Sequence, residues 1–116
     1  MDAEYFRKSW ESFCFGGFLF GRETVRRMVP SGKGTLLFTG ARASLRGRAN
    51  FCAFNSAKAG FRTLAQSIAK EYGAKGIHVG HVIIDGAIAG EKIKRHLPEL
   101  AKKTWRKRND KYRRYC

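Results

Sequence analysis

The sequence predicts an α/β fold built on a parallel sheet, and three observations lead to this prediction. Residues 35–39 are short, apolar and partly β-branched, as expected of a strand that is covered on both faces. Residues 77–84 form a second apolar run of strand length. Between them, residues 51–72 carry apolar side chains at helical spacing. A strand, a crossover helix and a strand make the βαβ unit, so we expect two parallel strands side by side, as part of a doubly wound sheet.

A long N-terminal helix is predicted over residues 3–29, ahead of the first strand. Apolar or small residues recur there every three or four positions and give one stripe: Phe6, Trp10, Phe13, Gly17, Phe20, and Val25 or Met28. Gly16, Gly17 and Gly21 each cost about 1 kcal/mol of helix propensity relative to Ala. Small residues on one helix face indicate that another backbone packs closely there. Pro30 ends the helix, and residues 31–34 have the composition of a turn.

The crossover helix has one apolar face and a clear stop signal. Its predicted inward residues are Phe54, Ala57, Phe61, Leu64, Ala65 and Ile68. Gly73 is suited to the position just after the helix, where a left-handed conformation is common. The segment before the helix, residues 40–50, is predicted to be a basic loop with Arg42, Arg46 and Arg48.

Charge divides the chain into two parts. Lys and Arg outnumber Asp and Glu by 24 to 9, and eleven basic residues against three acidic ones lie in residues 91–116. We therefore predict a domain at residues 1–90 and a basic C-terminal tail at 91–116, helical or disordered, with a thin stripe of Ile93, Leu97, Leu100 and Trp105. Residues 102–108 and 111–115 interleave cations with aromatic rings, as in single-stranded nucleic-acid binding and nuclear-localisation segments. A solvated terminus with weak, non-specific attraction to polyanions is the simpler interpretation.

Cysteine usage and hydropathy predict an intracellular, cytoplasmic protein that does not enter a membrane. Cys14, Cys52 and Cys116 are an odd number without metal-ligand spacing, and the first two lie in predicted helices. We expect these two to be small buried apolar groups. The chain does not start with a charged-then-apolar signal segment. The longest apolar run, residues 13–20, is far shorter than a membrane span.

Several shorter motifs do not support a site of their own. Residues 31–35 lack the spacing of a phosphate-binding loop and precede a strand instead of following one. The glycines of residues 16–21 lie within a helix, so helix packing explains them better than dinucleotide binding. His78 and His81 lie on opposite faces of a strand and cannot share a metal ion, so we predict no metal site.

Taken in order, these segments resemble the short-chain dehydrogenase/reductase family of NAD(P)-dependent oxidoreductases. The resemblance covers residues 3 to about 90 and includes the helix with Trp10 and the strand ending in Gly40. It also includes Phe54 and Lys58 of the second helix, and the final strand that leads to Gly86. It implies a Rossmann-like fold, carbonyl or alcohol redox chemistry, and NAD or NADP as cofactor.

Residue by residue, the resemblance implies a degenerate active site. The family's catalytic tyrosine falls on Phe54, which has no titratable group and no hydrogen-bond donor. The family's lysine, which orients the nicotinamide ribose and lowers the pKa of the tyrosine, is Lys58. The catalytic serine falls on Ala41, thirteen residues before Phe54, and Ser44 is the nearest hydroxyl. The catalytic asparagine falls on Phe13.

The resemblance also bears on the cofactor. The family's Gly-rich cofactor loop lies far upstream of its tyrosine, whereas only 53 residues precede Phe54 and none of them forms such a loop. Gly86 and Ile88 correspond to residues on the nicotinamide side. We therefore expect a truncated domain that binds NAD or NADP poorly by itself.

Two functions follow as hypotheses. The first is an oxidoreductase by descent that is weakly active or inactive alone. The second is a non-catalytic interaction module that binds polyanions through its tail or dimerises through its long helices. In the family, the two equivalent helices pack against a second subunit as a four-helix bundle. Self-association as a homodimer, or pairing with a full-length relative, is therefore expected to cover the apolar surface of residues 3–29 and 51–72.

Overall fold

The structure of the protein is a computed structural model that describes residues 2–86, 90–96 and 98–99. It divides into two units, Met1–Ile84 and Asp85–Cys116. The second unit contains the short helix α4 (Glu91–His96), in which Ile93 lies. Leu97, Leu100 and Trp105 of the predicted stripe, and the basic segments 102–108 and 111–115, lie outside the described residues.

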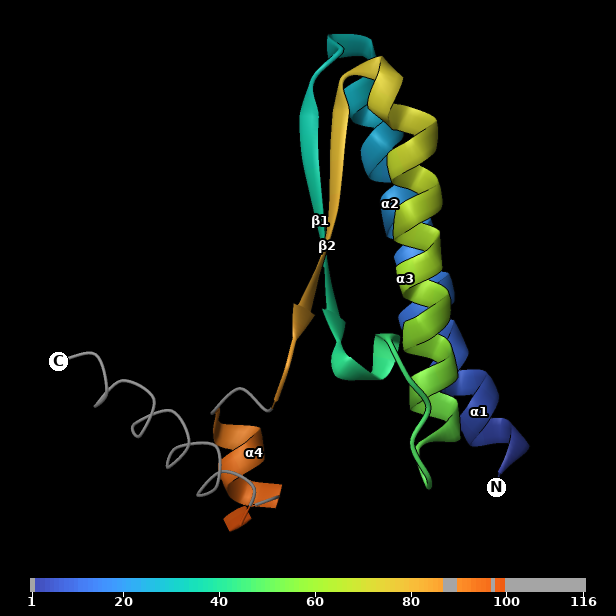
Figure 1. Cartoon of the computed structure of the whole chain (residues 1–116), viewed down its shortest axis with the longest axis vertical. Helices are drawn as coiled ribbons and strands as arrows, with labels where there is room; N and C mark the ends of the chain where they lie inside the picture. The colour runs from blue at the N-terminus through green and yellow to red at the C-terminus, as the bar shows by residue number, and fades with distance from the viewer. Residues whose placement is uncertain (1, 87–89, 97, 100–116) are drawn as a thin grey trace, which may run out of the picture. The chain divides into compact units, whose positions relative to one another are not determined.

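The first unit is built on the predicted pair of parallel strands. Strand β1 (Gly34–Ala41) pairs with β2 (Ile77–Ile84) in one register, from Gly34 opposite Ile77 to Ala41 opposite Ile84. Figure 1 shows both strands running in the same direction, with α3 (Cys52–Tyr72) connecting them. The strand–helix–strand prediction is confirmed. β1 is longer than predicted at both ends, because Gly34, Gly40 and Ala41 join the ladder.

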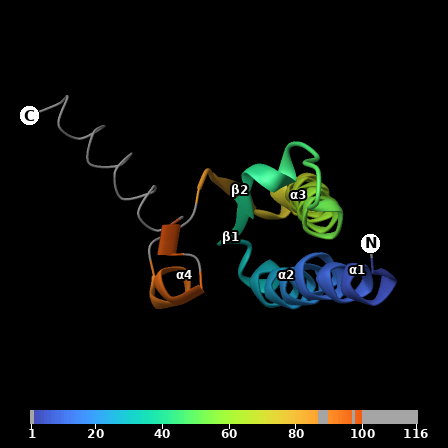
Figure 2. The ribbon, with the colours of Figure 1, turned by 90° about the horizontal axis from the view of Figure 1, so that it is seen from below.

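Only one face of β1 is covered among the described residues, so the prediction that both faces are covered is wrong for this part of the chain. Leu36 and Phe38 are buried, whereas Leu37 between them is 63% exposed. The reason is that the long helices all lie on the same side of the two strands (Figure 2). Side chains alternate along a strand, so every second residue of β1 points away from the helices.

The N-terminal helix forms as predicted but changes its winding partway along. α1 (Ala3–Trp10) continues into a π-helical segment, Glu11–Phe15, and then into α2 (Gly16–Met28). Asp2 begins the helix, because its carboxylate accepts a hydrogen bond from the Glu4 N–H at 3.0 Å. A 3₁₀ turn, Val29–Ser31, follows α2 and contains Pro30.

The π-helical segment shifts the face on which later residues lie, and the predicted stripe is only partly buried. Val25 is fully buried, but Trp10, Phe13 and Phe20 are 44%, 37% and 64% exposed. A uniform 3.6-residue period cannot account for the extra residue of a π turn, so a stripe drawn across this segment mixes inward and outward positions.

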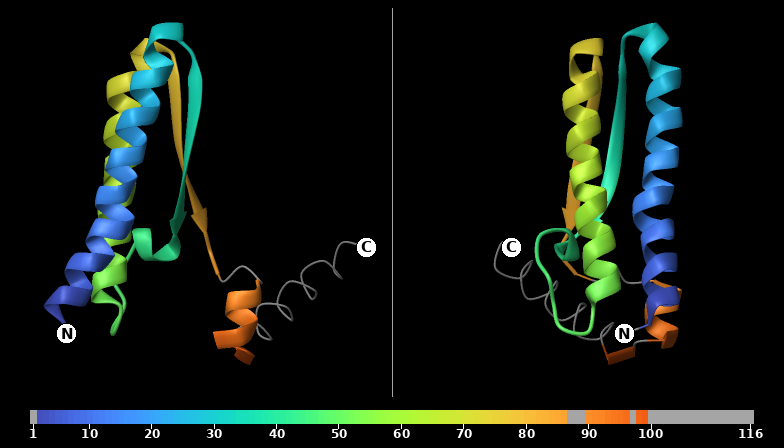
Figure 3. Two further views of the ribbon diagram at one scale, coloured as in Figure 1. Left: turned by 180° about the vertical axis from the view of Figure 1, so that it is seen from behind. Right: turned by 90° about the vertical axis from the view of Figure 1, so that its right-hand side faces the viewer.

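Two of the three helix glycines pack closely, though against side chains and not against another backbone as predicted. A Cβ atom at Gly17 would overlap the ring of Phe61, and one at Gly21 would press on the ring of Phe38. Phe38 and Phe61 contact each other edge-to-face with centroids 5.1 Å apart. These two glycines therefore allow α2 to approach the aromatic centre of the core. Figure 3 shows α2 and α3 side by side.

Helix α3 carries most of the core. Its buried residues are Ala53, Asn55, Ala57, Phe61, Ala65 and Ile68, while the predicted core residues Phe54 and Leu64 are half-buried. Cys52, at the first position of α3, is exposed and Cys14 is half-buried, so the prediction that both are buried is wrong. Asn55 is held by a 2.6 Å hydrogen bond from its Nδ2 to the carbonyl oxygen of Arg46.

The left-handed residue after α3 is Gly76, not Gly73 as predicted. Gly73 keeps a helical φ of −56° and begins a 3₁₀ turn, Gly73–Lys75, whereas Gly76 has φ 84°. The turn before β1 has the same form, with Gly32 at φ 65°. The backbone of Gly76 lies so close to the Gly32 carbonyl oxygen that a Cβ there would overlap it.

Candidate functional site

Three of the positions singled out in the sequence come together around Lys58. Its ammonium nitrogen Nζ lies 4.7 Å from the ring centroid of Phe13, 5.5 Å from that of Phe61 and 5.9 Å from that of Phe54. Phe13 comes from the π-helical segment, and the other two rings come from α3. We call Phe13, Phe54 and Phe61 the Lys58 aromatic cluster.

The environment of Lys58 is apolar on the side of the cluster. Its side chain is half-buried, and among the described residues it has no carboxylate within ion-pair distance. Loss of contact with water lowers the pKa of Lys58, since burial penalises the charged form. The ring faces attract the ammonium group, but they offer no oxygen lone pair to replace the lost water.

No proton donor stands at the position where the resembled family has its tyrosine. Phe54 meets Phe13 edge-to-face with ring centroids 5.4 Å apart. Both rings lack a titratable group. The pair therefore contributes shape and apolar surface next to Lys58 but cannot exchange a proton.

Ser44, the alternative hydroxyl, serves the local backbone. It is the last residue of a 3₁₀ turn, Arg42–Ser44, and is buried. Its Oγ accepts a 3.2 Å hydrogen bond from the N–H of Ala41 at the end of β1. This bond fixes the turn that leads from the strand into the basic loop.

The two remaining candidates are not part of this cluster. Gly86 is exposed, has φ 130° and belongs to the second unit. Ile88 lies outside the described residues. The described site therefore consists of Lys58, its aromatic cluster and the neighbouring residues of the first unit.

His81 is a neighbour that the sequence analysis did not connect with Lys58. Its ring lies 6.0 Å from that of Phe61, edge-to-face, and its Nε2 atom is buried without a hydrogen-bond partner in the described structure. Burial lowers the pKa of His81, and the positive charges of Arg62 and Lys58 lower it further. The alternation of side chains along β2 could have assigned Ile77, Val79 and His81 to one face of the strand. The sequence alone could not show which helix residues that face contacts.

Phe61 was predicted only as a core residue. Its place beside Lys58 follows from the three-residue spacing, which puts two side chains on the same side of a helix. That spacing was the available signal.

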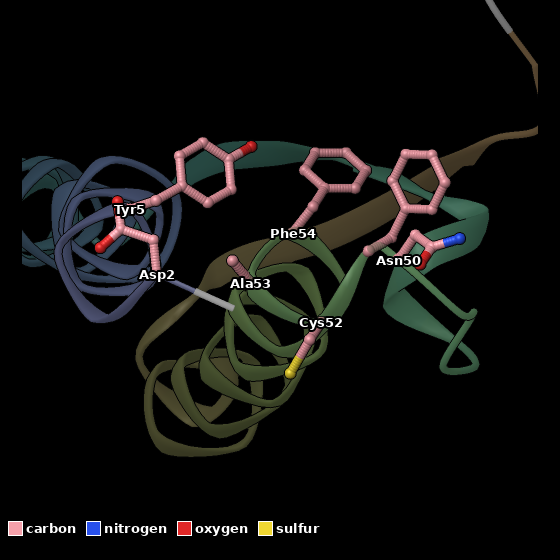
Figure 4. Close-up of a pocket in the computed structure, with 7 residues that line it drawn as sticks. Asp2, Tyr5, Asn50, Cys52, Ala53 and Phe54 are labelled. Atoms are coloured by element: carbon pink, nitrogen blue, oxygen red, sulfur yellow. The ribbon is translucent and has the colours of Figure 1, made fainter.

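A shallow pocket of about 450 Å³ lies between the starts of α1 and α3. Figure 4 shows the rings of Tyr5 and Phe54 on either side of it, with Asp2 and Cys52 nearby. The lining residues are Asp2, Tyr5, Asn50, Phe51, Cys52, Ala53 and Phe54. Sequence reasoning did not predict this pocket, because Asp2 and Tyr5 are distant from α3 in the chain.

Neither a metal centre nor a membrane span is found in the part of the chain that the structure describes. No group of three or more His, Cys, Asp or Glu side chains there is arranged to hold a metal ion. Among the same residues, none of the helices combines the length and the apolar character needed to cross a bilayer.

The parallel strands, the crossover helix and the lysine on its first half define a partial Rossmann-like α/β domain. Comparison with known proteins identifies the family. The sequence profile described as short chain dehydrogenase matches residues 1–99. The chain belongs to the short-chain dehydrogenase family.

Individual relatives agree with this assignment. Over 82 residues the chain is 32% identical to cis-4-hydroxycyclohexanecarboxylate dehydrogenase of Sinomonas cyclohexanicum, covering 71% of this chain and 33% of that protein. The crystal structure of a short-chain dehydrogenase from Rhodopseudomonas palustris is 44% identical, with a TM-score of 0.70 over 90% of this chain and 45% of the other. The TT0495 protein of Thermus thermophilus is 24% identical and shares the fold, with a TM-score of 0.74 over 88% of this chain and 44% of the other.

The chain thus spans between a third and a half of the length of these relatives. Its described residues fit a nicotinamide cofactor only in part. Lys58 offers a half-buried amine that can donate to a ribose hydroxyl. The adjoining Phe54 and Phe13 rings offer no polar group to the nicotinamide.

Proposed function

We propose that this chain is an NAD(P)-linked carbonyl or alcohol oxidoreductase by descent, and that it is weakly active or inactive alone. The observation that carries the proposal is the pairing of Lys58 with Phe54, a ring that lies 5.9 Å from Nζ and has no hydroxyl. In this proposal Lys58 retains the ribose-binding role, and Gly86 and Ile88 line the nicotinamide side.

The expected loss of reaction rate can be gauged from what general acid–base catalysis usually contributes. A positioned proton donor contributes typically about 10²–10⁴ in rate. Ser44 is a poor replacement, because it is buried and an aliphatic hydroxyl is a far weaker acid than the phenol of a tyrosine. The rate of any residual reaction should therefore lie about 10²–10⁴ below that of a site that keeps the tyrosine.

A single substitution tests the catalytic part. Phe54→Tyr is assayed for NADH and NADPH oxidation with 4-oxocyclohexanecarboxylate, a ketone chosen from the name of the Sinomonas relative. Phe51→Tyr, which adds a hydroxyl at an exposed ring in the same pocket, is the matched control. We expect no measurable turnover from either variant unless a second chain that carries the family's Gly-rich cofactor loop is supplied. Robust turnover by Phe54→Tyr alone would disprove the proposal.

Cofactor binding is tested separately by quenching of tryptophan fluorescence, with Trp10 and Trp105 as reporters. We expect no saturable change with micromolar NADH or NADPH in the isolated, folded chain. Saturable quenching would mean that Lys58 and its neighbours suffice for binding, and the redox role would then extend to the chain alone.

We propose, as a second candidate, a non-catalytic module that self-associates or pairs with a full-length relative. A row of exposed rings on the N-terminal helix supports it. Trp10 and Phe15 stack with centroids 6.0 Å apart, and Phe15 and Phe18 stack at 6.1 Å. These rings are about 40% exposed, and Phe20 beyond them is 64% exposed. Contiguous apolar surface of this kind is typical of an interface.

Sedimentation velocity of the full chain tests the association. Phe15→Ser should shift the chain towards monomer, whereas Arg26→Ser, at an exposed position on the same helix, should not. A wild-type chain that is monomeric at all concentrations would exclude self-association.

The hypothesis that the basic tail binds polyanions is tested by removing residues 91–116. Unchanged affinity for single-stranded DNA after this truncation would rule it out.

A further inference from the structure

We propose that the pocket between the starts of α1 and α3 binds small neutral phenols, held between aromatic rings and by a hydrogen bond to the Asp2 carboxylate. Binding of this kind goes beyond the proposed redox function, because it requires neither a nicotinamide cofactor nor a hydroxyl at Phe54. We call this space the α1–α3 pocket. Its volume of about 450 Å³ falls within the range of roughly 300–1,000 Å³ that is typical of small-molecule sites.

Three aromatic rings line the α1–α3 pocket, and two of them keep about half of their surface exposed. Tyr5 of α1 is 62% exposed, and Phe51, directly before α3, is 48% exposed. The third ring is Phe54, and Figure 4 shows it on the other side of the open space from Tyr5. A flat ligand between them can contact aromatic surface on two sides. Each aromatic pair of this kind improves affinity by about two- to tenfold.

The carboxylate of the pocket favours a ligand that donates a hydrogen bond. Oδ1 of Asp2 accepts the Glu4 N–H at 3.0 Å, whereas Oδ2 has no hydrogen-bond partner among the described residues. A carboxylate only accepts hydrogen bonds, so a ligand group that reaches Oδ2 must be a donor. The bond from a phenol hydroxyl to a carboxylate is charge-assisted and roughly twice as strong as a bond between neutral groups.

Charges of both signs border the pocket and disfavour a ligand with a full charge. A carboxylate ligand would meet the carboxylate of Asp2. An ammonium ligand would meet two cations, because Arg48 lies 5.4 Å from the Phe51 centroid and Lys58 Nζ lies 5.9 Å from that of Phe54. The start of α3 has no side-chain cap, and its partial positive charge of about half a unit adds to this repulsion. An uncharged ligand avoids both penalties.

The loop side of the pocket is fixed before a ligand arrives. Asn50, at the end of the basic loop, has φ 67°, a left-handed conformation that asparagine tolerates. The N–H of Phe51 donates to the Arg48 carbonyl oxygen at 3.2 Å, and the buried Asn55 holds the Arg46 carbonyl oxygen at 2.6 Å. Ligand binding therefore requires little further ordering of this loop, and low ordering cost favours affinity.

Alkylation of Cys52 reports whether the pocket is occupied. Cys52 is the first residue of α3, lines the pocket and is exposed, so a bound ring should slow its reaction with iodoacetamide. The full chain is treated with iodoacetamide at increasing concentrations of 4-methylphenol, and peptide mass spectrometry follows alkylation of Cys52 and Cys116. We expect saturable protection of Cys52 at millimolar or lower concentrations of 4-methylphenol, and no change at Cys116.

Three further ligands identify what the pocket recognises. 4-Methylanisole has the same ring without the donor, so it should need an about tenfold higher concentration for the same protection. 4-Methylbenzoate and 4-methylbenzylamine carry a negative and a positive charge, and both should protect Cys52 less than 4-methylphenol does. Equal or better protection by either charged ligand would overturn the proposal. So would an absence of protection by millimolar 4-methylphenol.

Two variants with matched controls assign the contacts. Asp2→Asn removes the charge but keeps an oxygen that can cap α1, and it should weaken 4-methylphenol binding several-fold. Glu23→Gln removes a carboxylate that pairs with Arg27 on α2 and should not change binding. Tyr5→Ala removes one ring and should weaken binding about two- to tenfold. Leu19→Ala, at a side chain of α2 that is 41% exposed, should have no effect.

The folding of each variant is verified by circular dichroism. If Asp2→Asn or Tyr5→Ala does not fold, the order of the ligands on the wild-type chain decides. Unchanged binding of 4-methylphenol to the folded Asp2→Asn and Tyr5→Ala variants would show that the ligand lies elsewhere and would refute the proposed site. The assay contains no nicotinamide, so its result is independent of the redox tests.

Discussion

The contact between Gly17 and Phe61 leads to a prediction in which two opposing effects can be weighed. Gly17→Ala should gain about 1 kcal/mol of helix propensity. The new methyl group would overlap the Phe61 ring, which is only 9% exposed and is held by Phe38 at 5.1 Å. Overpacking of this kind costs about 1–3 kcal/mol. We therefore expect a net loss of stability of about 1 kcal/mol.

Gly16→Ala is the matched control, because a Cβ there lies in ordinary contact, 3.4 Å from the nearest atom, the carbonyl oxygen of Glu11. It should keep the helix gain and stabilise the fold by up to about 1 kcal/mol. Urea unfolding followed by circular dichroism measures both variants.

A double-mutant cycle locates the cause. In a Phe61→Leu background the ring is gone, and Gly17→Ala should then be neutral or stabilising. If Gly17→Ala stabilises the wild-type chain as much as Gly16→Ala does, the packing of α2 against α3 described above is wrong.

Three further outcomes are expected. The pKa of His81 is lowered in the folded chain, so below pH about 6.5 the unfolded state binds more protons than the folded state. The free energy of unfolding should therefore fall as the pH drops through this range, and His81→Leu should weaken that pH dependence in acid titrations of unfolding. Gly76→Ala should cost more than about 1 kcal/mol in urea unfolding, because φ is 84° and the Cβ would overlap the Gly32 oxygen, and a smaller loss would contradict the turn. Asn55→Ala should cost about 1–2 kcal/mol by losing its bond to Arg46, and an unchanged thermal midpoint would refute this.

Local patterns predicted the elements well because each depends on nearby residues. The βαβ order follows from two apolar runs around an amphipathic helix, and the approach of Lys58 to Phe54 follows from helical spacing. The approach of Phe13 to Lys58 could be expected only from the family resemblance, because it depends on the π-helical segment. The exposure of Leu37 could not be predicted, because it depends on which elements lie on the far face of the sheet.

The register of the two strands has a consequence for how the chain folds. Each residue of β1 pairs with the residue 43 positions later, from Gly34 with Ile77 to Ala41 with Ile84. Bringing such distant residues together is entropically costly before any ladder contact forms. The 21 residues of α3 lie inside that interval, and their local contacts shorten the flexible segment to be closed. The rate of folding of the first unit should therefore depend on how readily α3 becomes helical in the unfolded chain.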